Sequence, residues 1–169
     1  MVSLGEFTLK SQEVVLSDPQ YSLEDKEGVI ISPIDIGLWR GFVLIDYSGS
    51  FAVNEELHAY KESLVVNNKP KSDLFWEILP DKVPVDSGQA GIFDTATFQN
   101  ENYVKTKPSM DTGNLWYDMC CDITSDKVRA GIVEGGVISS AGLGDGRYKV
   151  FVSKNNAGKI VAIKIVFEE

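Results

Sequence analysis

Alternating apolar and polar positions are clearest near the C-terminal end of the chain. Residues 147–154 alternate in this way, and residues 159–167 carry a second apolar set after the sequence Asn155-Asn156-Ala157-Gly158. A period of two is typical of a half-buried strand, and an Asn/Gly-rich segment between two such runs favours a tight turn. We therefore predict a β-hairpin over residues 147–167. One face of its second strand is formed by Val161, Ile163, Ile165 and Phe167.

Short β-branched and apolar runs, separated by Gly, Pro and Asn, recur along the rest of the chain. They cover residues 6–15, 29–31, 38–47, 64–66 and 128–140, and the last run bends at Gly135-Gly136. Such runs, bounded by turn residues, predict strands. Gly41 lies inside the run 38–47 and is a candidate bulge. Residues 95–114 are polar and poor in aliphatic side chains, which indicates a long loop.

One segment has helical rather than strand periodicity. Leu115, Met119 and Ile123 recur at i, i+4 and i+8, with Trp116 and Cys120 on the same side. This spacing predicts a main helix near residues 114–124. Asp111 or Thr112 is the candidate cap at its start.

Many short strands and one helix, without a repeat or a linker-like stretch, predict the fold class. We expect an α+β fold that is mainly antiparallel β, formed by a single β-rich domain over residues 1–169. The composition agrees, because 43% hydrophobic and 24% charged residues are close to the averages of globular proteins.

The chain is acidic, and this changes the picture of its partners. It has 16 Lys and Arg against 25 Asp and Glu, giving a net charge of −9. Nucleic-acid binding and docking on anionic lipid both need a basic surface, so neither is expected. The sequence shows no signal-peptide pattern and no apolar run long enough to span a membrane. The two cysteines are adjacent and cannot form a disulfide framework, so we expect a soluble cytoplasmic protein.

Few residues are of the kinds that most catalytic sites need. His58 is the only histidine and lies in a polar segment, which indicates a surface position. Cys120 and Cys121 lack the spacing of a zinc site, and residues 142–146 (GLGDG) lack the pattern of a phosphate loop. We therefore predict no catalytic residue, no metal site and no cofactor.

Residues 83–94 (VPVDSGQAGIFD) form the densest group of polar and glycine residues. In a plain strand, Asp86 and Asp94 would share one face, although the glycines interrupt such a strand. Two carboxylates can perform acid–base chemistry or hold a ligand, or they can accept backbone N–H bonds in turns. We favour the structural role. We also expect residues 83–94 and 142–148 to lie close together, with Asp86 or Asp94 near backbone N–H groups or Tyr148.

Three stretches together resemble a known family. They are residues 15–21 (VLSDPQY), residues 83–94, and residues 136–148 (GVISSAGLGDGRY). Their order is similar to that of DUF4241, a family of uncharacterised bacterial proteins with a GDG-Y turn and a closing strand pair. The resemblance implies no activity. It implies that seven residues gather as a binding site: Asp18, Tyr21, Asp86, Gln89, Asp94, Asp145 and Tyr148.

The sequence leaves three functions open. The first is a non-enzymatic binding or interaction domain with a basic protein partner, for instance an immunity protein against a nuclease toxin. The second is a carboxylate-based hydrolase or small-ligand binder that uses Asp86, Asp94 and Asp145. The third is a purely structural domain. Convergence of the carboxylates in one hollow would distinguish the second from the third.

Overall fold

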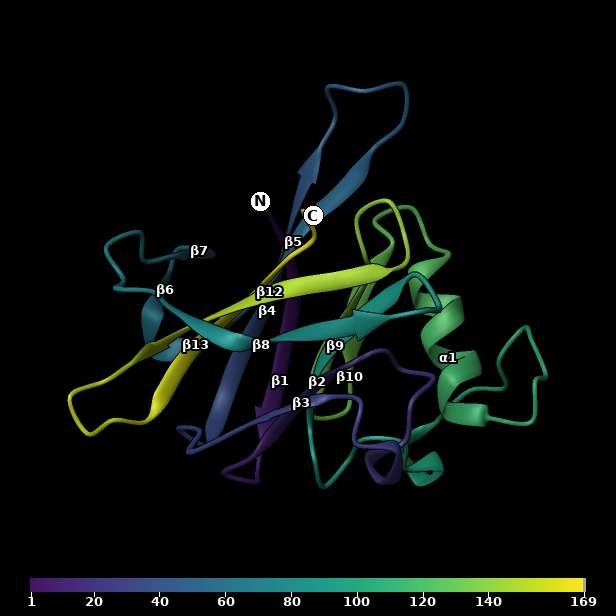
Figure 1. Ribbon diagram of the computed structural model, residues 1–169, viewed down its shortest axis with the longest axis horizontal. Coiled ribbons are helices and arrows are strands. Elements are labelled where there is room, and N and C mark those ends of the chain that lie inside the picture. The colour runs from purple at the N-terminus through teal and green to yellow at the C-terminus, as the bar shows by residue number, and fades with distance from the viewer. Residues whose placement is uncertain (169) are drawn as a thin grey trace.

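Two antiparallel sheets face each other and hold the main core between them (Figure 1). The computed structural model describes residues 1–168, and residue 169, the last of the expected domain 1–169, lies outside the described residues. The six-stranded sheet has the order β1 (Val2–Leu9), β4 (Gly37–Asp46), β5 (Val53–Lys61), β13 (Ile160–Val166), β12 (Gly146–Lys154) and β8 (Glu77–Val85). The five-stranded sheet has the order β10 (Ala130–Val133), β11 (Gly136–Ser140), β9 (Gln89–Asp94), β2 (Val14–Ser17) and β3 (Val29–Ile31).

The remaining elements are short. They are the helix α1 (Leu115–Thr124), the strands β6 (Val65–Val66) and β7 (Lys69–Pro70), and the 3-10 turns η1 (Leu23–Asp25), η2 (Glu62–Leu64) and η3 (Glu101–Tyr103). The expected fold class, mainly antiparallel β with one main helix, is confirmed. The predicted hairpin over residues 147–167 is β12 and β13, which pair antiparallel. In the described part of the chain, no helix has the length and apolar character needed to cross a membrane.

Close packing of the two sheets explains Gly41 in the middle of β4. A Cβ at this position would lie 2.7 Å from Cγ2 of Val137 on the opposite sheet. The irregular pairing next to it belongs to β1, between Ser3 and Gly5, and Gly41 itself is not a bulge. Gly41 is therefore required because the sheets approach too closely for a side chain.

Residues 128–140 form two strands rather than one bent strand. β10 and β11 pair with each other across a turn at Glu134 and Gly135, where Gly135 has a φ of +69°. Gly135, the first residue of the Gly-Gly sequence that indicated a bend, thus lies in the turn of a hairpin, because a positive φ suits glycine at a tight reversal.

The outer face of the five-stranded sheet is covered by α1. Trp116 and Cys120 of the helix are fully buried and pack with Phe93 and Ile138 of the sheet. The helix begins where expected, but its cap is Asn114, whose side chain accepts the N–H of Tyr117 at 3.0 Å. The expected caps, Asp111 and Thr112, lie before the helix, and the expected core residue Leu115 is 38% exposed.

The outer face of the six-stranded sheet is covered by residues 62–76, which include β6 and β7. Phe42, Tyr60 and Ala162 of the sheet are buried beneath Leu74 and Trp76. An apolar cover over this face gives the sheet a second, smaller core.

His58 is buried and stacks on Tyr60 on the same face of β5, so the expected surface position is wrong. Its side chain is nearly buried, with Nε2 2.6 Å from Glu56 Oε2 and Nδ1 2.8 Å from the Tyr60 hydroxyl. Burial lowers the pKa of His58, although the Glu56 carboxylate acts in the opposite direction. Glu56, His58 and Tyr60 therefore form a hydrogen-bonded row along β5, buried at His58 and Tyr60 and partly buried at Glu56.

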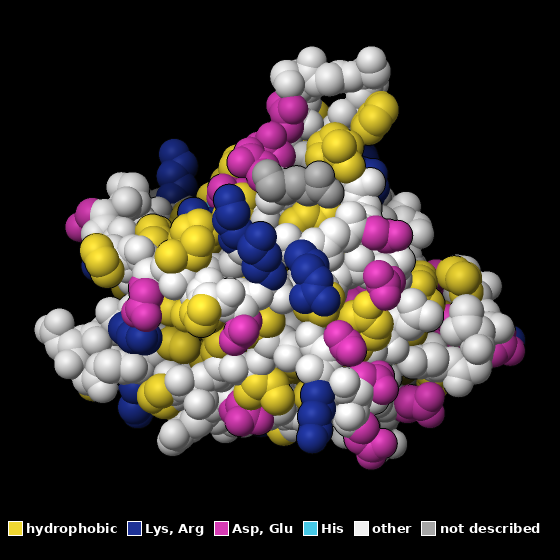
Figure 2. Space-filling view, viewed as in Figure 1, with side chains coloured by type: hydrophobic (Ala, Val, Ile, Leu, Met, Phe, Trp, Pro, Cys, Tyr) yellow, Lys and Arg dark blue, Asp and Glu magenta, His cyan; other side chains and the backbone are white. Residues whose placement is uncertain are grey.

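The β4–β5 hairpin extends beyond the sheets and is the projection at the top of Figures 1 and 2. Tyr47 and Phe51 near its tip are 70% and 67% exposed. Asp46 and Val53, the last strand pair before the loop of this hairpin, border the candidate site described below.

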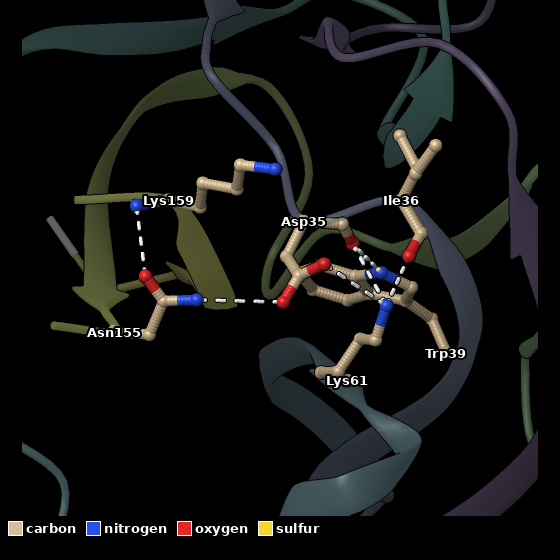
Figure 3. Close-up of polar contacts among 6 residues, drawn as sticks. All are labelled: Asp35, Ile36, Trp39, Lys61, Asn155 and Lys159. Carbon is tan, nitrogen blue, oxygen red and sulfur yellow. Dashed lines mark hydrogen bonds and ion pairs between the residues drawn. The ribbon is translucent and has the colours of Figure 1, made fainter. Parts of the chain in front are cut away.

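At the far end of β12, polar contacts fix the connection between β3 and β4 (Figure 3). Lys61 Nζ lies 3.2 Å from Asp35 Oδ1 and also donates to the carbonyl of Ile36. The indole of Trp39 donates to the carbonyl of Asp35 at 2.8 Å, and Asn155 lies beside the other carboxylate oxygen of Asp35. These contacts lie at one end of β12, and the opposite end of β12 carries the two turns described next.

Candidate functional site

The β8–β9 turn and the turn before β12 lie side by side. The amide of Ala141 donates to the carbonyl of Gly88 at 2.8 Å, and Gly146 pairs with Val85. The segments 83–94 and 142–148 are therefore adjacent, at the right of Figure 1.

Asp18 holds the β8–β9 turn. Its carboxylate is fully buried, and Oδ2 accepts the amides of Asp86 at 2.9 Å and Ser87 at 2.7 Å. Oδ1 accepts the Ser87 hydroxyl at 2.7 Å and the amide of Gln20 at 2.8 Å. Hydrogen bonds to an ionised carboxylate are strong, so this turn is rigid. Asp18 thus accepts the backbone N–H groups of this turn, a role that the sequence predicted for Asp86 or Asp94.

The Asp86 side chain is exposed and accepts a hydrogen bond from the hydroxyl of Tyr21. That hydrogen bond, together with partial burial, raises the pKa of Tyr21, and the negative charges of Asp86, Asp18 and Glu27 act in the same direction. The Tyr21 hydroxyl therefore stays protonated and orients the carboxylate at the surface.

Gln89 joins the turn to α1. Its Nε2 lies 3.4 Å from Cys121 Sγ, and its Oε1 accepts the Thr124 hydroxyl at 3.0 Å. Burial and a hydrogen bond with Cys121 raise the pKa of Tyr117 to about 12. The sequence did not indicate Ser87, Tyr117 and Cys121 as site residues. They meet only because α1 packs beside the β8–β9 turn.

Asp94 lies apart from the other predicted site residues. It is at the opposite end of β9, fully buried, and accepts the amides of Lys10 at 2.7 Å, Ser11 at 3.0 Å and Ala96 at 2.9 Å. It connects the β1–β2 turn to the turn after β9. The residues that the structure brings together are Asp18, Tyr21, Asp86, Gln89, Asp145 and Tyr148.

A broad hollow of about 800 Å³ opens beside the two turns. Four carboxylates border it, and Arg147 is the one Lys or Arg among the described residues that line it. In Figure 2, Asp and Glu side chains predominate to the right of centre, over the β8–β9 turn and the segment before β3. We call this the Tyr21 hollow, and its lining is Tyr21, Asp25, Glu27, Pro84, Val85, Asp86, Asp145, Gly146 and Arg147.

A second hollow, of about 470 Å³, lies between the last strand pair of the β4–β5 hairpin and the turn before β12. Asp145 borders both hollows, so the two are neighbours. Tyr148 closes the turn between them by donating its hydroxyl to the carbonyl of Gly144 at 2.6 Å. We call this the Leu143 hollow, and its lining is Asp46, Val53, Glu55, Gly142, Leu143, Asp145, Tyr148, Phe167 and Glu168.

Asp and Glu side chains predominate in both hollows, and Arg147 is the one Lys or Arg among the described residues that border them. None of the ion pairs within residues 1–168 includes a carboxylate that lines either hollow. Partial burial and the charges of Asp46 and Glu168 raise the pKa of Glu55. Repulsion among Asp46, Glu55 and Glu168 therefore persists at the Leu143 hollow and favours the approach of a cation there.

The groups needed for nucleophilic or metal chemistry are dispersed. His58 and the cysteines lie on opposite outer faces, with both sheets between them. Burial raises the pKa of the Cys120 thiol, which keeps it protonated. No group of three or more His, Cys, Asp and Glu side chains within residues 1–168 is arranged to hold a metal ion. The site thus offers a rigid, acidic surface.

Comparison with known proteins agrees with the resemblance seen in the sequence. The family model of a protein of unknown function, DUF4241, matches residues 53–165 of the 169. No curated protein and no solved structure gives a significant match to the chain. The matched stretch contains the β8–β9 turn, α1 and the turn before β12. The chain therefore belongs to the DUF4241 family.

Proposed function

We propose that this chain is a non-enzymatic binding domain whose Tyr21 hollow receives a basic segment of a protein partner. The observation that carries the proposal is the set of carboxylates at Asp25, Glu27, Asp86 and Asp145, which border one hollow and take part in none of the ion pairs within residues 1–168. Complementary charge accelerates association and rejects partners of the wrong sign.

The rigidity of the β8–β9 turn supports this function. Asp18 fixes the backbone at Asp86 and Ser87, and Tyr21 orients the Asp86 carboxylate. A binding surface that is already ordered loses less conformational entropy when the partner docks. Buried hydrogen bonds beneath an exposed carboxylate are therefore favourable for recognition.

The net charge of −9 extends the proposal to a class of partner. A strongly basic toxin, such as a nuclease, fits an acidic surface, and this chain would then act as an immunity protein in the cytoplasm of a bacterium. Its carboxylates would occupy the cationic surface with which such a toxin binds nucleic acid.

The geometry gives less support to a hydrolase that uses Asp86, Asp94 and Asp145. Asp94 is fully buried at the other end of β9, and three amides occupy its carboxylate. Asp86 and Asp145 remain at the surface and can bind a cationic group.

The test is the affinity for a fluorescein-labelled nonaarginine peptide, measured by anisotropy at about 150 mM salt. We expect the double variant Asp86→Asn/Asp145→Asn to bind roughly tenfold more weakly than the unaltered protein, equivalent to about 1.4 kcal/mol. Both side chains are exposed, so the substitutions leave the fold intact.

The matched control is Asp73→Asn/Glu101→Gln, which removes the same charge from exposed positions outside both hollows. We expect less than a twofold change in affinity for it. Equal losses in the two double variants would show that only net charge attracts the peptide, and would overturn the proposed site.

A further inference from the structure

We infer that the Leu143 hollow is the anchor pocket for one arginine side chain of the basic partner. The inference rests on the proposed function and names the group that the partner inserts. The hollow joins an apolar lining at Val53, Leu143 and Phe167 to carboxylates at its border. A long side chain with an apolar stem and a cationic end matches both parts.

The apolar part of the pocket is held by a fixed turn. Leu143 is 87% exposed, yet its neighbours are bonded on both sides: the amide of Gly142 donates to Asn54 O at 3.0 Å, and that of Gly144 donates to Ala141 O at 2.7 Å. Gly142 has a φ of +50°, which glycine adopts without strain. The turn therefore presents the Leu143 side chain to solvent in a defined position, where the methylene groups of an inserted side chain can cover it.

The polar part of the pocket has an excess of negative charge. Glu55 lines the hollow together with Asp46 and Glu168, and partial burial together with the charges of both raises the pKa of Glu55. None of the ion pairs in the described part of the chain neutralises these carboxylates. An inserted cation would relieve this repulsion, which adds to the free energy of binding.

Continuity with the Tyr21 hollow places this pocket inside the proposed interface. Asp145 borders both hollows, on the turn that separates them. A basic segment seated over Asp86 therefore passes Asp145 and can insert one side chain beside Leu143. Interfaces usually gain most of their affinity from a few such buried anchors, among which arginine is frequent.

Arginine suits the pocket better than lysine. A guanidinium presents five N–H donors in a planar fork that can bond more than one carboxylate, here Asp46, Glu55 or Asp145. It is also more weakly hydrated than an ammonium group, so it enters a partly apolar hollow at a lower desolvation cost.

The experiment is an NMR titration of the full chain with single-residue probes. N-acetylargininamide is compared with N-acetylcitrullinamide, which has the same shape without the charge, and with N-acetyllysinamide. We expect saturable amide shifts at Val53, Gly142 and Leu143 with the arginine probe, at least fivefold weaker binding of the lysine probe, and no shifts with the citrulline probe.

Two variants and a control identify the pocket. Leu143→Ser removes the apolar lining and Glu55→Gln removes one charge, and we expect each to weaken binding of the arginine probe at least threefold. Asp81→Asn removes an exposed charge from β8 outside both hollows, and we expect it to bind as the unaltered protein does.

Three results would overturn the inference. The first is the absence of arginine shifts at the Leu143 hollow while nonaarginine still binds through Asp86 and Asp145, a result that leaves the proposed function standing. The second is equal binding of the lysine or citrulline probe. The third is a concentration-dependent shift at the same amides without any probe, which would identify a second copy of this chain as the occupant. If nonaarginine instead binds Asp86→Asn/Asp145→Asn and its control Asp73→Asn/Glu101→Gln with equal affinity, the proposed function is wrong. The anchor depends on that function and would be wrong with it.

Discussion

Replacing Asp18 by Asn tests how strongly one buried carboxylate holds the site. Asn keeps the shape but offers one acceptor oxygen. Its best orientation leaves that oxygen facing the amides of Asp86 and Ser87, and turns its NH₂ group toward the amide of Gln20. Two charge-assisted bonds become neutral, at about 1 kcal/mol each, and the Gln20 amide loses its acceptor, at about 1 kcal/mol. We expect Asp18→Asn to lower the free energy of unfolding by about 3 kcal/mol.

Urea unfolding followed by tryptophan fluorescence measures this change, and Asp86→Asn is the matched control. The Asp86 side chain is exposed and accepts one hydrogen bond, from Tyr21, which an Asn oxygen can also accept. We expect it to cost less than about 1 kcal/mol. The reasoning would be refuted by a loss below about 0.5 kcal/mol for Asp18→Asn, or by equal losses for the two variants.

Three further predictions concern the framework around the site. Ile163→Asp should cost several kcal/mol in a thermal or urea melt, because Ile163 is fully buried between the sheets, and melting at the wild-type temperature would contradict this. Gly41→Ala should cost about 1–3 kcal/mol, because its Cβ would lie 2.7 Å from Val137, and an unchanged melting temperature would mean that the sheets separate freely. His58 has a lowered pKa in the folded chain, so only the unfolded chain takes up a proton as the pH falls below about 6.5, and stability should decrease by up to about 1.4 kcal/mol per pH unit. Urea melts between pH 7 and 5 should show a smaller decrease for His58→Gln, and parallel decreases would assign the proton uptake to other groups.

The elements with strong local patterns could be predicted from the sequence. The alternation in β12 and β13 and the helical spacing of Met119 and Ile123 are properties of short segments. The hairpin and the helix α1 both form where expected. β5 could not be assigned in this way, because Glu55, Glu56 and His58 give it a polar appearance. On its outer face, Tyr60 is buried against Trp76 of the segment 62–76, a contact between segments that no local pattern encodes.

The candidate site shows the same limit. The sequence indicated that turns rich in Asp and Gly would meet, and they do, because both flank the paired strands β8 and β12. It did not indicate that Asp18 rather than Asp86 would accept the amides of the turn. Any nearby carboxylate can serve as such an acceptor, and the choice is made by the path of the chain between β2 and β3.

The order of the strands has a consequence for where this fold can be divided. The stretch that matches the family, residues 53–165, begins at β5, yet β4 lies between β1 and β5, and β2 lies between β9 and β3. A fragment that starts at residue 53 would lose β4, which pairs with β5, and β2, which pairs with β9. Both β5 and β9 would then be unprotected edge strands, which promote aggregation. It would also lack Asp18. An expression boundary for this chain should therefore include its first four strands, since the stretch that matches the family model is shorter than the unit that folds.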